Sequence, residues 1–242
     1  MVTTAPKIRP TARDRQIFWH VLRYGLTTQE AVYRLFFDPQ SDHPDAVRSN
    51  LRRLHNGGYL NSVSDPLPYF RLTKLAVALI EPLLSVARGR YEHAWSNLKK
   101  PQLIERLAVH AFCCLGETPR RVLLQHEFIH FFHEFSRPGI HPWPYYIEST
   151  PDGSVLCLIV VDSSAPPGQQ VERVQHQIRR RRQIPAIREL DLAGRFRFTL
   201  LTTTTQRASE IRAALYAAQA NGVRVETVPQ LSSILLEPEP IP

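Results

Sequence analysis

The stretch AVRSNLRRLHNGGYL, residues 46–60, decides how the first part of this chain folds. Val47, Leu51 and Leu54 recur at the spacing of an α-helix, so they predict a helix with one buried stripe. The pair Gly57-Gly58 predicts the end of that helix, because glycine readily adopts the backbone conformation in which helices stop. A hydrophobic stripe of this kind places the helix against a core.

The opposite side of the same helix is basic and polar. Arginine donates pairs of hydrogen bonds to base edges and phosphates, which suits a helix that enters a major groove of DNA. Arg71, on a strand expected further along, is a candidate for a phosphate contact. The alternative is a small helical domain with a solvated arginine face. The helix residues that we expect to contact duplex DNA are Arg48, Ser49, Arg52 and Arg53.

Two further helices and a hairpin surround this helix in the sequence. Residues 14–25 and 26–37 have helical spacing of apolar side chains, and Thr27 and Thr28 are suitable N-caps. After the glycines, residues 59–63 and 69–73 read as short strands on either side of a turn. Three helices followed by a hairpin is the order of a winged helix-turn-helix.

The whole chain predicts a mixed, α+β class of fold. We expect a flexible arm at 1–11, a winged helix-turn-helix at 12–80, a helical connector at 81–100, an α/β domain at 101–236 and a Pro-rich tail at 237–242. The α/β domain has the order strand, strand, helix, strand, helix, strand, which predicts a mixed sheet flanked by helices. Its expected strands are 142–148, 155–162, 195–203 and 223–228, and its expected helices after the second strand are 170–184 and 207–221.

Composition favours a nucleic-acid partner. The chain has 242 residues and a formal net charge of +8, and its basic residues are mostly arginine. The run Arg179-Arg180-Arg181-Arg182 is the densest positive charge, and we expect it to contact phosphates. The alternative for this run is a solvated helix face. For the chain as a whole, the alternative is a high-GC genome, which raises arginine usage by itself.

The cysteines and the N-terminus favour a cytoplasmic protein. Cys113, Cys114 and Cys157 lie in apolar runs without a C-x-x-C pattern, so they read as buried free thiols and give no thiolate zinc motif. The N-terminus lacks the apolar segment of a signal peptide, and no stretch has the length of a membrane span.

Six segments together resemble the replication-relaxation family, a group of plasmid and mobile-element proteins. The likeness runs from about Asp14 to about Ala218, in order and spacing. It implies a winged helix followed by a restriction-endonuclease-like domain, with double-stranded DNA as partner. It also implies a role in mobilisation, replication control or transcriptional regulation, and other proteins of the element or a second copy as candidate partners. The segments are RDRQIFWHVLRYGLTTQEAVYRLFF, AVRSNLRRLHNGGYL, LIERLAVHAF, IHPWPYYI, LCLIVVDSS and QVERVQHQIRRRRQI.

The resembled family carries a metal-dependent cleavage site from which this chain departs. The family has an acidic residue after a proline and an acidic pair on the next strand, which together hold Mg²⁺. Here the first position is Pro142-Trp143, and Val160 replaces a glutamate, leaving Asp162. We therefore expect an inactive nuclease-like fold without a cofactor. The alternative is a Mg²⁺-dependent DNA-nicking relaxase or endonuclease with a divergent site. Its candidate carboxylates are Asp162, Glu127, Glu148 and Asp152.

HEFIH, residues 126–130, fits the helical zinc-protease pattern H-E-x-x-H. His126 and His130 are its candidate zinc ligands, and His133 or Glu148 is a candidate third ligand. The third-ligand patterns of known zinc proteases are absent from the sequence. An amphipathic helix over residues 126–135 with its polar face outward explains the same residues, so the zinc hydrolase is the least favoured reading.

Overall fold

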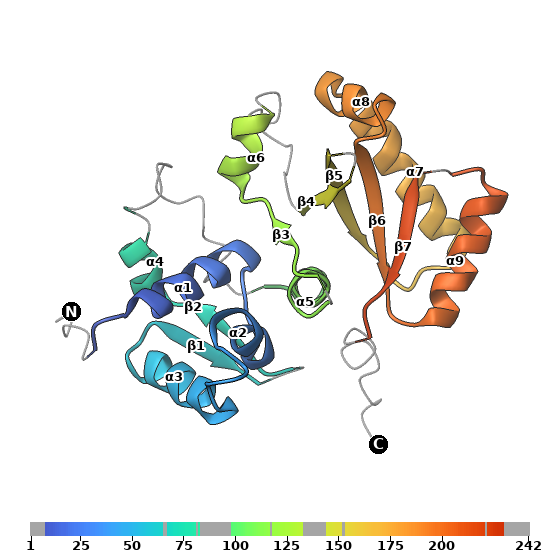
Figure 1. The fold of residues 1–242 in the computed structure, drawn as a ribbon. Helices are drawn as coiled ribbons and strands as arrows, with labels where there is room; N and C mark the ends of the chain where they lie inside the picture. Colours follow the sequence, from blue (N-terminus) through green and yellow to red (C-terminus); the bar gives the residue numbers. More distant parts are fainter. Residues whose placement is uncertain are drawn as a thin grey trace, which may run out of the picture. The chain divides into compact units, whose positions relative to one another are not determined.

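A computed structural model describes residues 8–64, 67–80, 82, 98–116, 118–132, 144–151, 153–220 and 222–229 (Figure 1). The chain forms two compact units. The first comprises Met1–His110 and Cys114–Glu117, and the second comprises Ala111–Cys113 and Thr118–Pro242. The division falls within helix α5 (Lys100–Cys114), later than the expected boundary at residue 100.

The first unit has the predicted order of three helices followed by a hairpin. Strands β1 and β2 pair antiparallel, with Leu60 opposite Leu72. Thr27, between the first two helices, forms a bridge to Phe70 through backbone hydrogen bonds of 2.9 and 2.8 Å. The small sheet therefore gains a third segment of chain. Its elements are α1 (Ala12–Tyr24), α2 (Gln29–Phe36), α3 (Pro44–Asn56), β1 (Leu60–Val63), β2 (Tyr69–Leu72) and α4 (Lys74–Ile80), with α5 following.

Local sequence signals set the ends of α1 and α3. Thr11 and Asp14 form a reciprocal capping box at the start of α1, and Gly25 ends that helix with φ 77°. The predicted stripe of α3 is confirmed, because its three apolar residues are at most 1% exposed. The predicted stop is confirmed too, since α3 ends before Gly57 and Gly58 has φ 75°.

The second unit contains a five-stranded mixed sheet with the order β3-β4-β5-β6-β7. The first two pairings are antiparallel and the last two are parallel, so the predicted mixed sheet is confirmed. Strand β3 and helix α8 were not predicted. The elements are β3 (Arg121–Val122), α6 (Gln125–Phe131), β4 (Tyr145–Thr150), β5 (Gly153–Val161), α7 (Pro167–Arg182), α8 (Pro185–Leu192), β6 (Phe196–Thr202), α9 (Thr205–Ala217) and β7 (Val223–Thr227).

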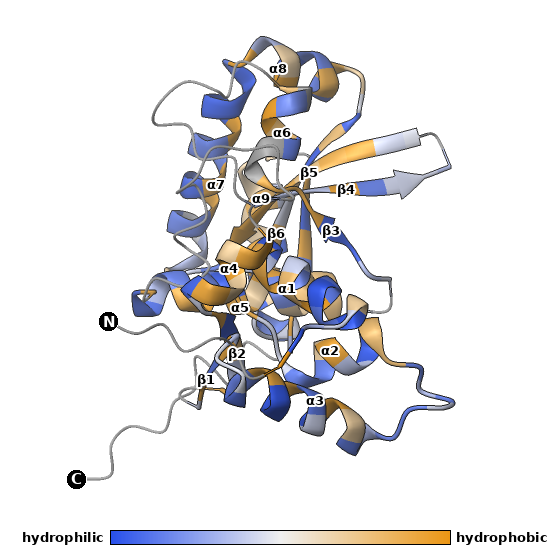
Figure 2. Ribbon diagram, turned by 90° about the vertical axis from the view of Figure 1, so that its left-hand side faces the viewer, coloured by the Kyte–Doolittle hydropathy of each residue, from blue (hydrophilic) through white to orange (hydrophobic). Residues whose placement is uncertain are grey.

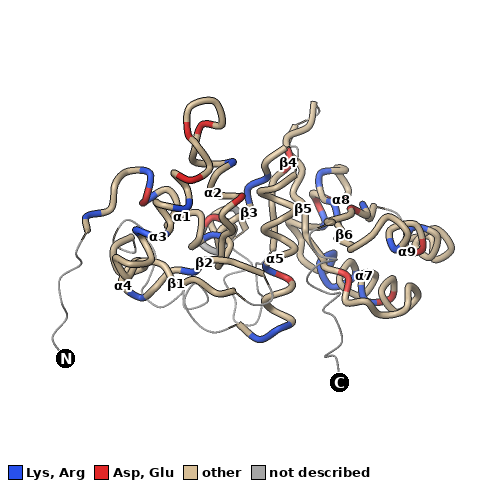
Figure 3. Tube along the Cα trace, turned by 90° about the horizontal axis from the view of Figure 1, so that it is seen from below, with Lys and Arg blue, Asp and Glu red and all other residues tan. Residues whose placement is uncertain are grey.

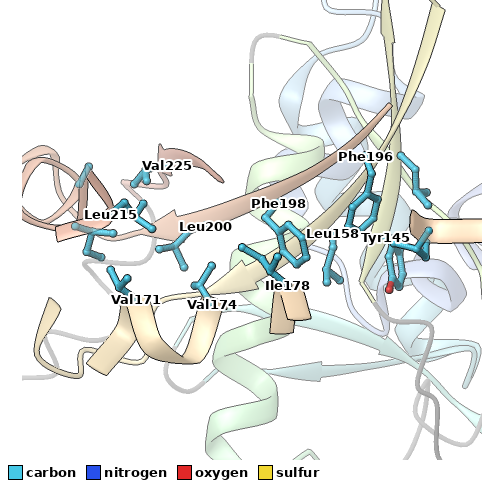
Figure 4. Packing of buried hydrophobic residues seen from close by; sticks show 14 of the residues in the cluster. Tyr145, Leu158, Val171, Val174, Ile178, Phe196, Phe198, Leu200, Leu215 and Val225 are labelled. Atoms are coloured by element: carbon cyan, nitrogen blue, oxygen red, sulfur yellow. The ribbon is translucent and has the colours of Figure 1, made fainter. Parts of the chain in front are cut away.

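Helices α7, α8 and α9 contribute side chains to one core on the sheet (Figure 4). Leu158, Phe198 and Leu200 project from the strands toward Val174 and Ile178 of α7. Along α7, hydrophilic residues alternate with the hydrophobic ones that enter this core (Figure 2). The helix therefore buries one face and presents the other to solvent.

Several predicted segments differ from the structure or fall outside its described residues. Residues 8–11 belong to the folded unit rather than to an arm, since the Tyr59 hydroxyl donates to the Ile8 carbonyl at 2.9 Å. Most of the helical connector expected at 81–100 and the whole tail at 237–242 lie outside the described residues. In the described part of the chain, no helix combines the length and the apolar character needed to cross a membrane.

Candidate nucleic-acid interface

The face of α3 opposite its buried stripe carries exposed polar side chains. Arg48, Ser49 and Arg52 are all exposed. Arg48 lies 3.4 Å from Asp45 in an ion pair whose partners are both more than half exposed, so the pair contributes little stability and can be exchanged for other anions. Arg52 has no ion-pair or hydrogen-bond partner among the described residues. Basic residues on α3 and on α7 are marked in Figure 3.

Arg53 lies on the same helix but is engaged inside the unit. Its Nη2 donates to both carboxylate oxygens of Asp14 at 2.6 and 2.7 Å, and the Asn50 amide donates to the same carboxylate at 3.2 Å. Asp14 is fully buried. Burial by itself would raise the pKa of Asp14, but the hydrogen bonds from Arg53, Thr11 and Asn50 outweigh it and hold that pKa below its ordinary value. Arg53 therefore fixes α3 to α1.

Arg71 does not lie where a phosphate contact was expected. It is 5% exposed, and burial lowers its pKa. This burial counts against the phosphate contact expected of Arg71.

The basic run at the end of α7 is divided by the helical periodicity. Arg181 is 9% exposed and lies beside Tyr145, where burial raises the pKa of the tyrosine to about 12 and Arg181 acts in the opposite direction. Arg182 pairs with Asp191 at 2.7 Å. Arg179 and Arg180 are exposed and, unlike Arg182, have no carboxylate partner among the described residues.

Asp162 follows β5 and is 5% exposed. Arg207 donates to its two oxygens at 2.7 and 3.1 Å, and the Ser164 backbone N–H donates at 3.1 Å. The hydrogen bond to Asp162, together with nearby acidic charge, raises the pKa of Arg207 despite its partial burial. The carboxylate is therefore already neutralised by a bidentate partner, which leaves little opportunity for metal coordination.

Glu148 is also engaged by arginines, and the sheet keeps it far from Asp162. Glu148 on β4 accepts from Arg197 at 3.1 Å and from Arg224 at 2.8 Å. It pairs with Val155, seven residues before Asp162, which corresponds to roughly 23 Å along a strand. These two carboxylates therefore do not form one metal site. Asp152 lies outside the described residues.

Glu127 has a local structural role at the start of α6. Its carboxylate accepts from Arg121 and from the Leu124 backbone N–H, the latter at 2.7 Å. Helix α6 ends at Phe131, earlier than the expected Phe135. His130 is exposed, whereas the side chain of His126 and residue His133 lie outside the described residues. The HEFIH zinc hypothesis therefore stays an untested prediction.

Sequence reasoning missed Asp14 as the residue that holds α3. The local signal was present, because Thr11 and Asp14 have the spacing of a capping box, but nothing in it indicates a partner on another helix.

Comparisons with family models, with curated proteins and with solved structures find no match to this chain.

Proposed function

We propose that the first unit binds double-stranded DNA as a winged helix-turn-helix, with α3 in the major groove. The observation that carries the proposal is the exposed face of α3, where Arg48, Ser49 and Arg52 lie opposite a buried stripe. The order of three helices and a hairpin supports it, as does the bridge between Thr27 and Phe70. A recognition helix needs this combination of one packed face and one donor-rich face.

The spacing of the two arginines suits base pairs that are two steps apart. Arg48 and Arg52 are one helical turn apart, a rise of about 6 Å. This rise is close to two base-pair steps of roughly 3.4 Å each. Each guanidinium presents a planar fork of donors to a guanine edge, and Ser49, on the same exposed face, is a donor to a base or a phosphate.

The clamp between Asp14 and Arg53 supports the proposal by fixing the orientation of α3. With Asn50 also bound to Asp14, the middle of the helix is tied to the start of α1. A recognition helix held in this way loses little conformational entropy when it binds. In this proposal Arg53 positions α3, and Arg48, Ser49 and Arg52 contact the DNA.

For the second unit we propose a restriction-endonuclease-like fold that does not cleave DNA. The pairing of Asp162 with Arg207 and the large separation of Asp162 from Glu148 support this proposal. Arg179 and Arg180 would add contacts to phosphates without reading sequence. A role in mobilisation, replication control or transcription of a plasmid or mobile element rests on the family resemblance.

The test is a duplex-binding titration by fluorescence anisotropy at fixed salt. Arg52→Ala should weaken binding by at least about 1 kcal/mol, or roughly fivefold. Arg188→Ala is the matched control, because Arg188 is an exposed arginine on α8 and its loss changes net charge equally. Equal effects of the two variants would mean that only net charge matters, and an unchanged affinity for Arg52→Ala would refute the role of α3.

A further inference from the structure

Three metal-ligand side chains converge inside the first unit, away from α3. His20 comes from α1, and His110 and Cys114 come from α5. Their ligand atoms all lie within 4.8 Å of one another, and the three residues are 8%, 1% and 3% exposed. Ninety residues separate His20 from His110, so the fold and not a local motif brings them together.

The hydroxyls of Tyr24 and Thr27 lie beside this cluster. His110 and Cys114 are four residues apart, which puts them on one face of α5. His20 and Tyr24 have the same spacing on α1, and Tyr24 hydrogen-bonds to Cys114. The Thr27 hydroxyl lies 3.4 Å from the Nε2 atom of His110. The two helices thus offer two imidazoles and a thiol, with two hydroxyls in contact.

The distance between the imidazoles fits a shared metal ion. The two Nε2 atoms are 3.3 Å apart. Two nitrogens bound to one tetrahedral zinc ion, at Zn–N distances near 2.0–2.1 Å, are roughly 3.3 Å apart as well. A hydrogen bond between two neutral imidazoles gives the same separation, so the distance permits both arrangements. The Cys114 thiol adds a third ligand atom to the two imidazoles within 4.8 Å.

Burial shifts the pKa values of all three side chains. Burial lowers the pKa of His110 to about 3, and burial together with the charges of His110 and Arg23 lowers that of His20 well below its ordinary value. Burial thus disfavours the charged form of both imidazoles. Burial raises the pKa of the Cys114 thiol to about 12, so metal binding must displace its proton to solvent as the metal–sulfur bond forms.

We propose that His20, His110 and Cys114 bind a structural zinc ion that joins α1 to α5. Imidazole nitrogen and thiolate sulfur are both zinc ligands in proteins, and the hydroxyl of Tyr24 or Thr27, or a water, would have to supply the fourth position. The burial of all three residues fits a closed structural site rather than a catalytic one, which needs an open position. Since the ligands come from two elements, zinc binding stabilises the unit by favouring the folded state. This site is independent of the proposed DNA contacts.

The test is the zinc content of full-length protein purified without a metal-affinity tag from zinc-supplemented medium. We expect stoichiometric zinc in the wild type and at least about a tenfold loss of affinity in Cys114→Ser and His110→Ala. Cys113→Ser is the matched control, because it removes the adjacent buried thiol that is not in the cluster. His130→Ala controls for the HEFIH segment. Zinc retained by Cys114→Ser and lost by His130→Ala would overturn the proposal.

Cobalt substitution of the wild type provides a test that does not depend on a variant folding. Co²⁺ bound to the cluster should give a sulfur-to-metal charge-transfer band, and zinc should displace it. Retention of the band in Cys113→Ser would support Cys114 as the ligand. A wild-type protein that takes up neither zinc nor cobalt, and whose melting temperature is the same with zinc and with a chelator, would contradict the proposal.

Discussion

The Asp14 carboxylate accepts hydrogen bonds of 2.6 and 2.7 Å from the Nη2 atom of Arg53, which joins the first turn of α1 to α3. The same carboxylate caps α1 through the Thr11 backbone N–H at 2.7 Å. One buried acid thus fixes both the start of the first helix and the position of the third. In the proposed function, this relationship holds the exposed arginines of α3 in place.

Asp14→Ala should destabilise the protein by about 2–4 kcal/mol, because it removes a helix cap and leaves Arg53 and Asn50 without their acceptor. Urea unfolding of the purified variant measures the change. Asp45→Ala is the matched control, since its ion pair with Arg48 is exposed and should contribute less than about 1 kcal/mol. Equal losses in the two variants would contradict the structural role of Asp14.

The contribution of Asp14 to the free energy of unfolding should disappear in acid. Its pKa is lowered in the folded state from an ordinary value of 3.8, so the folded protein favours the ionised form more than the unfolded chain does. The resulting stability is present above pH 3.8 and is lost as the pH falls through the lower, folded value. The difference in unfolding free energy between wild type and Asp14→Asn should shrink below that pH. A difference that stays constant from neutral pH to about pH 2 would contradict this account.

Asp162→Ala should destabilise the second unit without removing any nuclease activity. The Asp162–Arg207 pair is nearly covered, with side chains 4% and 17% exposed, and breaking such a pair costs on the order of 3–5 kcal/mol. The exposed Arg182–Asp191 pair offers a control, since Asp191→Ala should cost far less. If the protein nicks plasmid DNA in the presence of Mg²⁺ and Asp162→Ala abolishes this activity, the alternative of a DNA-nicking enzyme would be established instead.

Arg179 and Arg180 should contribute to the salt dependence of DNA binding. If each contacts one phosphate, replacing both with alanine should reduce the slope of log K against log salt by about 1.8. Anisotropy titrations at several salt concentrations give this slope. Arg188→Ala/Arg195→Ala changes two exposed arginines elsewhere in the unit and should leave it nearly unchanged. An unaltered slope in the α7 variant would assign that run to a solvated face.

Local patterns predicted much of the fold. The spacing of Val47, Leu51 and Leu54 gave the buried face of α3, and alternating or continuous apolar runs gave the strands of the mixed sheet. These signals succeed because the periods of helices and strands are fixed by backbone geometry. Strand β3 was missed because two residues are too few to show a period.

Long-range contacts were beyond local patterns. Asp14 and Arg53 are 39 residues apart, and only the packing of α1 on α3 makes them partners. Arg71 was expected to contact a phosphate because it lies on the second strand of the predicted hairpin, whereas most of β2 is buried. The convergence of His20 with His110 likewise follows from the fold, and the spacing of His110 and Cys114 was its only local trace.

Cross-linking from α3 to DNA tests the central claim most directly. The three native cysteines are buried, so a cysteine introduced at Ser49 can be labelled selectively with a photo-cross-linker. Ala78→Cys, on an exposed position of α4, serves as the control site. The account predicts efficient cross-linking to duplex DNA from position 49 and little from position 78. Equal yields from both positions, or no cross-link from position 49 under binding conditions, would contradict it.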